Sequence, residues 1–440
     1  MKKVTLFILL LVMSTMLSLA QWQKLDLTKV GGGTINLNIN RLTLDGGKLY
    51  AASYDGIWVS PSANGGDWEP FGLQGLKVTH LSFGVLKLAV VSVTATNDAT
   101  KSASQLYRLD GATWVKTKFN ETAVSTFGGP SSAFTQIQDA DNKTIIFVPS
   151  WGGGIWRSAD GGEIWTNYAQ STTNDGAVYK NVIGLFTFPG STTIYGTDKV
   201  ATNFNYLIYS EDFGITWKNN FVGAFFNPHA LLARKYNGAN YLFYGGQNGN
   251  DGVVWRSADM GVNWDASLTA GVPYWEIRKI IGEDDGAVYA LSSINNVYVS
   301  TDNGDQFTAV GTGITIPATR TAPASATYYL SDLVKSDKKL YLSAVKDDGI
   351  YYFDLSTNAI NSISETKLKC YPNPASESLS IQSVSGSKIS IYSLTGKLVK
   401  TASCESGFIS LDVKQLKPSA YIVKVQSPDG KQVAKQFFKK

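Results

Sequence analysis

The sequence has 440 residues, of which 43% are hydrophobic and 17% are charged. This length allows one large domain and a small one, and the hydrophobic content excludes a disordered chain. The formal net charge is +4, but residues 363–440 hold 12 Lys and 5 acidic residues (+7), whereas residues 21–362 carry about −5. Because the basic part contains no Arg, we expect no nucleic-acid partner.

Residues 1–20 are expected to be a secretory signal peptide. Met1-Lys2-Lys3 give a basic start, an apolar run follows, and Ser18-Leu19-Ala20 give small residues before a cleavage site. The alternative, a transmembrane anchor, needs a longer apolar run. The mature chain is expected to begin near Gln21, with no transmembrane segment after signal cleavage.

A motif of the form Ser-x-Asp-x-Gly-x-x-Trp, which we call the box, occurs four times, once with Phe in the last place. Its Ser and Asp side chains suit the capping of backbone groups in a tight turn, and its Gly suits a positive φ. The aromatic residue can pack beside the turn. We interpret the box as the hairpin between the third and fourth strands of a repeated unit. The copies are Ser158, Asp160, Gly162 and Trp165; Ser210, Asp212, Gly214 and Trp217; Ser257, Asp259, Gly261 and Trp264; and Ser300, Asp302, Gly304 and Phe307.

Degenerate copies extend the series to seven units. The marker positions are 64, 110, 160, 212, 259, 302 and 354, with spacings of 43 to 52 residues. Two or three strand-like stretches precede most markers. We therefore predict an all-β chain with a seven-bladed β-propeller at residues 21–362, because a radial arrangement lets each sheet bury both faces.

Two segments are candidates for the strand that closes this ring. Residues 21–27 read QWQKLDL and resemble the outer strands that follow the box in other units. We infer that they pair with the last blade and remove an exposed edge. Residues 360–364, INSIS, remain the alternative.

The boxes resemble the Asp-box, or BNR, repeats of sialidase-like and sortilin-type propellers over about residues 21–360. The resemblance implies a propeller fold and a structural role for the box. In those families the box lies on the face opposite the ligand site, so the resemblance says little about function.

The C-terminal part, residues 363–440, predicts a small antiparallel β-sandwich, because alternating strands are separated by Thr395-Gly396 and Asp429-Gly430 turns. It resembles the type A C-terminal sorting domain of the type IX secretion system. The resemblance implies the type IX secretion machinery as a partner and a secreted or outer-membrane-surface location. It also implies removal of the domain after export. The matching positions are Tyr371, Pro372, Asn373, Pro374, Gly396 and Tyr421.

Cys370 and Cys404 are the two cysteines of the chain and both lie in this C-terminal part. In an oxidising envelope they are compatible with a disulfide. Two buried free thiols fit the sequence equally well.

Ligand-binding candidates lie on loops between second and third strands and between units. Aromatic rings beside amide and carboxylate groups suit sugar rings or peptide side chains. Packing between blades is the alternative role for each ring. The candidates are Trp151, Phe225, Asn248, Tyr274 and Trp275.

No catalytic pattern stands out. Sialidase chemistry needs three converging arginines, and the arginines here do not fit that pattern. Another glycosidase would need two carboxylates about 5–10 Å apart. The two histidines, His80 and His229, have no ligand cluster around them, and we expect no metal and no cofactor. The candidate acids are Asp55, Asp251, Glu276 and Asp347, each of which also fits a solvated loop acid.

Two functions therefore remain. The first is a secreted or surface binding propeller for glycan or protein ligands. The alternative is a glycoside hydrolase that acts on extracellular polysaccharide. We favour binding because no catalytic pattern is found.

Overall fold

The structure is a computed structural model, and its chain divides into two compact units, Met1–Leu355 and Ser356–Lys440. The described residues form β-strands and no helix. In that part of the chain we find no helix with the length and apolarity that crossing a bilayer requires. The signal peptide expected at residues 1–20 lies outside the described residues. These are 21–95, 98–119, 126–127, 135–151, 154–168, 181–188, 191–201, 204–224, 226–248, 251–265, 276–293, 296–312, 314, 330–344, 349–355, 370–382, 385–393, 397–405, 408–426 and 432–440.

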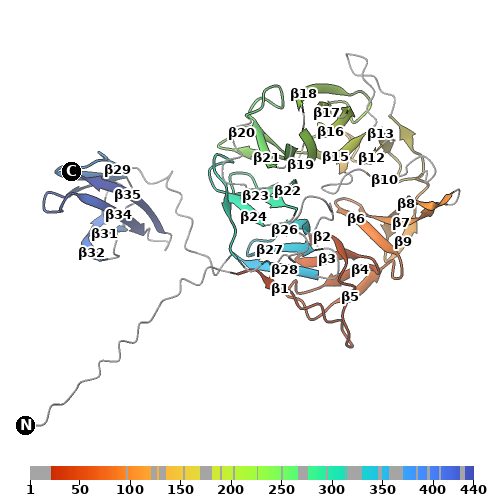
Figure 1. The fold of residues 1–440 in the computed structure, drawn as a ribbon, viewed down its shortest axis with the longest axis horizontal. Coiled ribbons are helices and arrows are strands. Elements are labelled where there is room, and N and C mark those ends of the chain that lie inside the picture. Colours follow the sequence, from red (N-terminus) through yellow and green to blue (C-terminus); the bar gives the residue numbers. More distant parts are fainter. Residues whose placement is uncertain are drawn as a thin grey trace, which may run out of the picture. The chain divides into compact units, whose positions relative to one another are not determined.

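The described residues of the first unit form seven antiparallel sheets arranged in a ring (Figure 1), which we number in chain order. Sheet 1 contains β2 (Ile39–Asp45), β3 (Lys48–Ser53), β4 (Gly56–Ser60) and β5 (Glu69–Gly72). Sheet 2 contains β6 (Lys77–Phe83), β7 (Lys87–Ala95), β8 (Asp98–Asp110) and β9 (Thr113–Lys116). Sheet 3 contains β10 (Thr126–Phe127), β11 (Thr135–Gln138), β12 (Thr144–Trp151), β13 (Gly154–Ser158) and β14 (Thr166–Asn167).

The remaining sheets follow the same meander. Sheet 4 contains β15 (Val182–Thr187), β16 (Ile194–Ala201), β17 (Phe204–Ser210) and β18 (Lys218–Ala224). Sheet 5 contains β19 (Phe226–Tyr236), β20 (Ala239–Asn248) and β21 (Asp251–Ser257). Sheet 6 contains β22 (Ile277–Gly282), β23 (Val288–Ser292), β24 (Val297–Ser300) and β25 (Thr308–Ala309). Sheet 7 contains β26 (Leu330–Lys335), β27 (Lys339–Ala344), β28 (Gly349–Asp354) and β1 (Gln23–Lys24).

The cores of the first unit lie between neighbouring sheets. The middle strands β4 and β23 are buried at every residue, including both faces of the strand. A strand with apolar residues at successive positions needs cover on both faces. The first strands also contact one another around the ring, as β2 does with β6 and β26. Each sheet is therefore packed between two others.

The ring is closed by the N-terminal strand, which confirms the interpretation of residues 21–27. In β1, Gln23 pairs with Tyr352 and Lys24 with Tyr351 of β28. Trp22 is 4% exposed, and its Nε1 donates a hydrogen bond to the Val310 carbonyl at 2.8 Å. The alternative segment, residues 360–364, lies outside the described residues.

Each box folds into a turn held by its own side chains. In the second copy, the Ser210 hydroxyl lies 2.8 Å from the Asp212 carboxylate and accepts a hydrogen bond from Gly214 N at 2.8 Å. Asp212 also accepts one from Thr216 N at 2.8 Å. Trp217 Nε1 donates to the Gly214 carbonyl at 3.2 Å. The other three copies make the matching Ser–Asp and Gly–Ser hydrogen bonds.

The turn between β4 and β5 is held by a residue other than the marker of the repeat pattern. The pattern marks Asn64, but the Ser60 hydroxyl bonds to the Asp67 carboxylate at 2.5 Å. Asp67 also accepts a hydrogen bond from the Ser62 hydroxyl at 2.6 Å. The carboxylate here comes from the C-terminal end of the turn, directly before Trp68. It holds the turn although its distance in sequence from the Ser differs from that in the boxes.

Box turns also join neighbouring sheets through arginines near the end of the third strand. Arg108 of sheet 2 donates to the Gly161 carbonyl at 2.7 Å, and Arg157 of sheet 3 donates to the Phe213 carbonyl at 2.9 Å. Arg256 donates in the same way to the Asn303 carbonyl of sheet 6 at 2.6 Å. All three acceptors are the fourth residue of a box and have positive φ.

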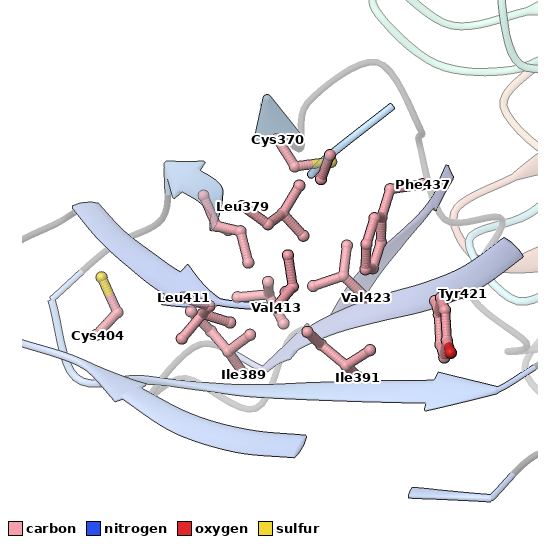
Figure 2. Close-up of a cluster of buried hydrophobic side chains, with 13 residues drawn as sticks. Cys370, Leu379, Ile389, Ile391, Cys404, Leu411, Val413, Tyr421, Val423 and Phe437 are labelled. Atoms are coloured by element: carbon pink, nitrogen blue, oxygen red, sulfur yellow. The ribbon is translucent and has the colours of Figure 1, made fainter. Parts of the chain in front are cut away.

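The second unit is a two-sheet sandwich. One sheet contains β29 (Cys370–Tyr371), β30 (Ser378–Gln382) and β33 (Phe408–Asp412), and the other contains β31 (Ser387–Ser393), β32 (Leu398–Cys404), β34 (Ser419–Gln426) and β35 (Gln432–Lys439). Figure 2 shows the core between them, with Cys370 and Cys404 in different parts of it. Both cysteines are buried and free, so the disulfide alternative is not present.

Candidate binding edge and a buried polar belt

The meander puts the box turns and the candidate binding loops on opposite edges of the sheets. Boxes connect third to fourth strands, whereas the binding candidates connect second to third strands, and successive turns of an antiparallel meander alternate edges. Trp151 ends β12, and Asn248 pairs with Asp251 where β20 turns into β21. Asp55 lies between β3 and β4. We call this side the binding edge and the other side the box edge.

Several candidate residues cannot be placed in more detail. Phe225, Tyr274, Trp275 and Asp347 lie outside the described residues. For Trp151, Asn248 and Asp251 the backbone is described and the side chains are not. Their part in a ligand site therefore stays a prediction.

Asp55 supports its own loop. Its carboxylate accepts a hydrogen bond from Gly75 N at 2.9 Å, and its carbonyl accepts one from Trp58 Nε1 at 3.0 Å. The first bond joins the β3–β4 turn to the segment that follows β5, and the second joins the turn to β4. The side chain thus has a structural use whether or not a ligand binds beside it.

Glu276 differs from the expectation of a solvated loop acid, since it is only 2% exposed. Its carboxylate forms ion pairs with His229 and, at 3.3 Å, with Arg278 Nη1. Burial by itself raises the pKa of Glu276, but the hydrogen bond and charge of His229 and the charge of Arg278 outweigh it, so the pKa lies below its usual value. Glu276 is therefore a buried carboxylate anion that joins β19 to the start of β22.

This ion cluster belongs to a wider pattern of bulges in the first strands. Six of these strands shift register against the second strand near their beginning, which is the signature of a β-bulge. A bulge places one extra residue in the strand and redirects the side chains beside it. The shifts lie between Ile39 and Arg41, Val78 and His80, Val182 and Gly184, Pro228 and Ala230, Ile277 and Lys279, and Leu330 and Asp332.

Bulge residues bond to the first strand of the next sheet. Asn40 Nδ2 donates to the Val78 carbonyl at 2.7 Å. One sheet earlier, the Ser331 hydroxyl donates to the Ile39 carbonyl at 3.1 Å. The two acceptors hold the same position, directly before a bulge, so the contact occurs both between sheets 7 and 1 and between sheets 1 and 2.

The residues that follow the bulges add charge. Asp332 is buried, accepts a hydrogen bond from Leu42 N at 2.9 Å and forms an ion pair with Lys279 at 2.5 Å. It thereby joins sheets 6, 7 and 1. Because a buried carboxylate needs partners for its charge, this arrangement fixes the three first strands relative to one another.

Arg41 continues the chain of contacts to sheet 2. Its Nη1 donates to the Ser331 carbonyl at 3.3 Å, and its Nη2 lies 3.3 Å from His80 Nε2. Burial and the charge of Arg41 lower the pKa of His80 well below 6.5. His80 is therefore neutral at pH 7 and accepts a hydrogen bond from the guanidinium.

We call this group the buried polar belt. Sequence analysis missed it, although it has a recognisable signal: two adjacent polar residues interrupt an apolar first strand. The signal occurs as Ile39-Asn40-Arg41-Leu42, Val78-Thr79-His80-Leu81, Ile277-Arg278-Lys279-Ile280 and Leu330-Ser331-Asp332-Leu333. The belt comprises Asn40, Arg41, His80, His229, Glu276, Arg278, Lys279, Ser331 and Asp332.

A cavity of about 470 Å³ lies on the box edge, between sheets 7 and 1. Its walls come from the β2–β3 turn at Gly46, the turn at Asn64 and the β26–β27 turn at Lys338. It does not coincide with the predicted binding edge. Among the described residues, no group of three or more His, Cys, Asp or Glu residues is arranged to hold a metal ion.

Comparison with known families gives two matches. Residues 9–243 match the family described as the DUF6242 beta propeller domain. Residues 369–440 match the secretion system C-terminal sorting domain. No curated protein matches the chain.

Solved structures are similar to the chain at low sequence identity. PorZ of Porphyromonas gingivalis, a surface component of the type IX secretion system, is 13% identical, with 92% of this chain and 59% of that chain covered and a TM-score of 0.47. The GH74 xyloglucanase of Xanthomonas campestris is 13% identical, covers 95% and 68%, and has a TM-score of 0.51. YCF48 of Cyanidioschyzon merolae is 12% identical, covers 77% and 100%, and has a TM-score of 0.50. The chain thus spans less than two thirds of PorZ, and identities of this size show the fold alone.

Proposed function

Since the chain belongs to the family of DUF6242 β-propeller domains, we propose that its propeller is a binding module for a glycan or protein ligand outside the cell. The chain ends in a sorting domain, so the protein is secreted to the cell surface through the type IX machinery. The proposal concerns what the propeller does once it is there. A glycoside hydrolase remains the alternative.

We extend the proposal to the finer architecture. It comprises a signal peptide at residues 1–20, a seven-bladed Asp-box propeller at 21–362 and a sorting domain at 363–440. The seven sheets of the first unit support the blade number. The repeated hydrogen bonds between box Ser, Asp and Gly support the Asp-box assignment.

The binding proposal depends on a difference between the two edges of the sheets: one edge holds the box turns, and the other holds the candidate ligand residues. On the box edge, polar side chains are used in turns and in contacts between sheets. At the binding edge, Trp151 ends β12 of sheet 3, and Asn248 pairs with Asp251 at the β20–β21 turn of sheet 5, which supports the proposed site. Aromatic and amide groups on loops held by a rigid ring are suited to ligand recognition.

Glu276 argues against a hydrolase that uses this residue as its general acid. A glycosidase acid needs a raised pKa so that it holds a proton near neutral pH. The pKa of Glu276 is lowered by His229 and Arg278 despite the burial that raises it. Its carboxylate is already occupied by these two partners.

A glycan-array screen of the mature protein, with mass spectrometry of any released product, tests the proposal. Intact bound glycans that are lost in Trp275→Ala or Trp151→Ala would support a binding edge. Phe221→Ala is the matched control, because Phe221 is an exposed aromatic residue on β18. Equal loss in the control would refute the location of the site.

The same screen distinguishes the alternative. Shortened products that disappear in Asp251→Asn would make the protein a hydrolase and overturn the proposal. If no glycan binds, the glycan form of the proposal fails, and a protein ligand is then sought with the same variants.

A further inference from the structure

The four-stranded sheet of the sorting domain has an outer face with exposed apolar side chains. In β34 the residues alternate, so that Tyr421, Val423 and Val425 are buried in the core, which Figure 2 shows for the first two. Ile422 therefore points to the other face, and it is 37% exposed. On the neighbouring strands, Leu398 is 48% and Phe438 is 50% exposed.

The strand register brings these residues together. Tyr392 of β31 is paired with Leu398 on one side and with Ile422 on the other. Phe438 is paired with Ala420, two residues before Ile422 on the same face. Side chains directly opposite each other lie about 5 Å apart, and diagonal neighbours about 7–8 Å apart. Leu398, Tyr392, Ile422 and Phe438 thus form a row across all four strands, which we call the outer apolar row.

The outer apolar row is not part of the hydrophobic core of this unit. None of its four residues belongs to the buried cluster of this unit or to the partly buried side chains packed against that cluster. In a half-exposed antiparallel sheet the outer positions are ordinarily polar. A contiguous apolar row at these positions is typical of a surface that binds a partner.

Lysines flank the row on the same sheet. Lys424 follows Ile422 by two residues and so shares its face, and Lys397 directly precedes Leu398. Lys388 lies on β31 at an exposed position. In the described part of this unit, the ion pair formed joins Lys414 to Glu377 and involves none of these three lysines. Residues 363–440 carry a formal charge of +7.

We propose that the outer apolar row is a docking surface for a protein of the secretion machinery whose own surface is apolar with an acidic rim. Charge complementarity selects this partner, because residues 363–440 carry a formal charge of +7. A second copy of the domain does not fit, since two surfaces of the same sign repel. The proposal rests on the sorting-domain assignment and is independent of any ligand at the propeller.

The shape of the row favours a protein over a membrane. Leu398, Ile422 and Phe438 are between 37% and 50% exposed and Tyr392 is partly buried, so each side chain lies partly against the sheet. Insertion into a bilayer needs apolar groups that project beyond the polar surface by about 5–10 Å. A flat row instead suits the flat face of another protein.

The test is export of the full-length protein in a host with a type IX secretion system. Ile422→Ser and Phe438→Ser together are expected to reduce the surface-exposed fraction, measured by protease accessibility on intact cells, by about tenfold or more. Phe408→Ser is the matched control, because Phe408 is 45% exposed but lies on the other sheet. Unchanged export of the double variant, or equal loss in the control, would overturn the proposal.

A second pair of variants tests the charge. Lys388→Glu with Lys424→Glu is expected to reduce export. Lys414→Glu, an equal change per residue in the segment that follows β33 of the other sheet, is expected to leave export unchanged. Thermal unfolding of each purified variant separates a lost contact from a lost fold, because a folded but unexported variant supports docking.

If the variants fail to fold, a photo-crosslinking residue at position 422 is compared with one at position 408 in the otherwise unchanged protein. Crosslinks to a secretion protein at 422 alone support the proposal, crosslinks to lipid overturn it, and equal crosslinking at both positions overturns it.

Discussion

At the scale of single residues, the stability of the propeller depends on buried charges, each of which is compensated by specific partners. Glu276 holds His229 and Arg278 at the junction of sheets 5 and 6. Asp332 holds Lys279 and the backbone of Leu42. Removal of one partner leaves a buried charge without compensation, which costs more than the pair contributes.

Glu276→Gln is expected to lower the free energy of unfolding by about 3–5 kcal/mol, because Arg278 remains buried and charged. Glu283→Gln is the control: its partner Lys335 is contacted at 2.7 Å, but the carboxylate is 65% exposed. Exposed pairs contribute about 0–1 kcal/mol. Urea unfolding of both variants measures the difference, and equal effects would contradict the assignment of Glu276 as a buried anion.

His80 makes the stability of the propeller depend on pH. Burial and Arg41 lower its pKa well below the usual 6.5 in the folded protein. As the pH falls below 6.5, the unfolded chain takes up this proton and the folded protein does not, so stability decreases. The loss from one group is at most about 1.4 kcal/mol per pH unit.

Denaturant unfolding between pH 7.5 and pH 5 measures this dependence, and His80→Gln is expected to reduce the slope below pH 6.5. Glu276 does not interfere in this range, since its pKa lies below its usual value of 4.5. A slope that is the same in wild type and variant would contradict the prediction.

At the scale of elements, the box turn serves both its own hairpin and the neighbouring sheet. Within the turn, Ser and Asp satisfy backbone donors. Between sheets, the box Gly lies against the preceding sheet, so that a Cβ on Gly304 would meet Phe243 at 2.5 Å. The positive φ and the close approach together require glycine.

Gly304→Ala is therefore expected to lower the free energy of unfolding in two ways, through backbone strain and through overpacking. Its φ is +93°, which an L-residue adopts at a cost of about 1 kcal/mol or more. The contact with Phe243 adds about 1–3 kcal/mol of overpacking. Gly111→Ala is the control, because its φ is also positive, at +58°, but nothing lies near the new Cβ. Thermal unfolding should show the larger shift for Gly304→Ala, and a larger shift for Gly111→Ala would contradict the packing argument.

At the scale of the whole molecule, the ring of sheets is completed by the beginning of the chain. Gln23 pairs with Tyr352, a partner 329 residues away in sequence. Trp22 packs into the cluster of sheets 6 and 7 beside Phe353, with ring centroids 5.3 Å apart. The N-terminal segment thus contributes a buried aromatic side chain as well as a short strand.

Trp22→Ala is expected to destabilise the propeller by about 3–5 kcal/mol, as does truncation of a buried tryptophan elsewhere. Val30→Ala, at a 62% exposed position of the same N-terminal segment, is expected to have little effect. Calorimetry of the mature protein measures the propeller transition. A normal transition in Trp22→Ala would show that closure does not depend on this side chain.

The sequence predicts much of the fold and less of the site, for reasons that particular residues show. The boxes at Asp160, Asp212, Asp259 and Asp302 were visible because each is a local pattern that repeats. In sheet 1 the repeat pattern marks Asn64 and not Asp67, because a turn can take its carboxylate from either side. Glu276 was expected on a solvated loop although Arg278 is only two residues away, because its other partner, His229, becomes a neighbour only when sheets 5 and 6 pack together.

By itself, the sequence determined the β-rich repeat, the candidate closing strand and the sorting domain, which implies a location at the cell surface. These features depend on local spacing and on side-chain type, which folding does not change. Only the tertiary structure decided that Gln23 and Lys24 pair with β28, that the cysteines remain separate and that bulges align a buried polar belt. Such features depend on pairings between residues that are distant in the chain, and a pairing of this kind is set by the packing of whole sheets.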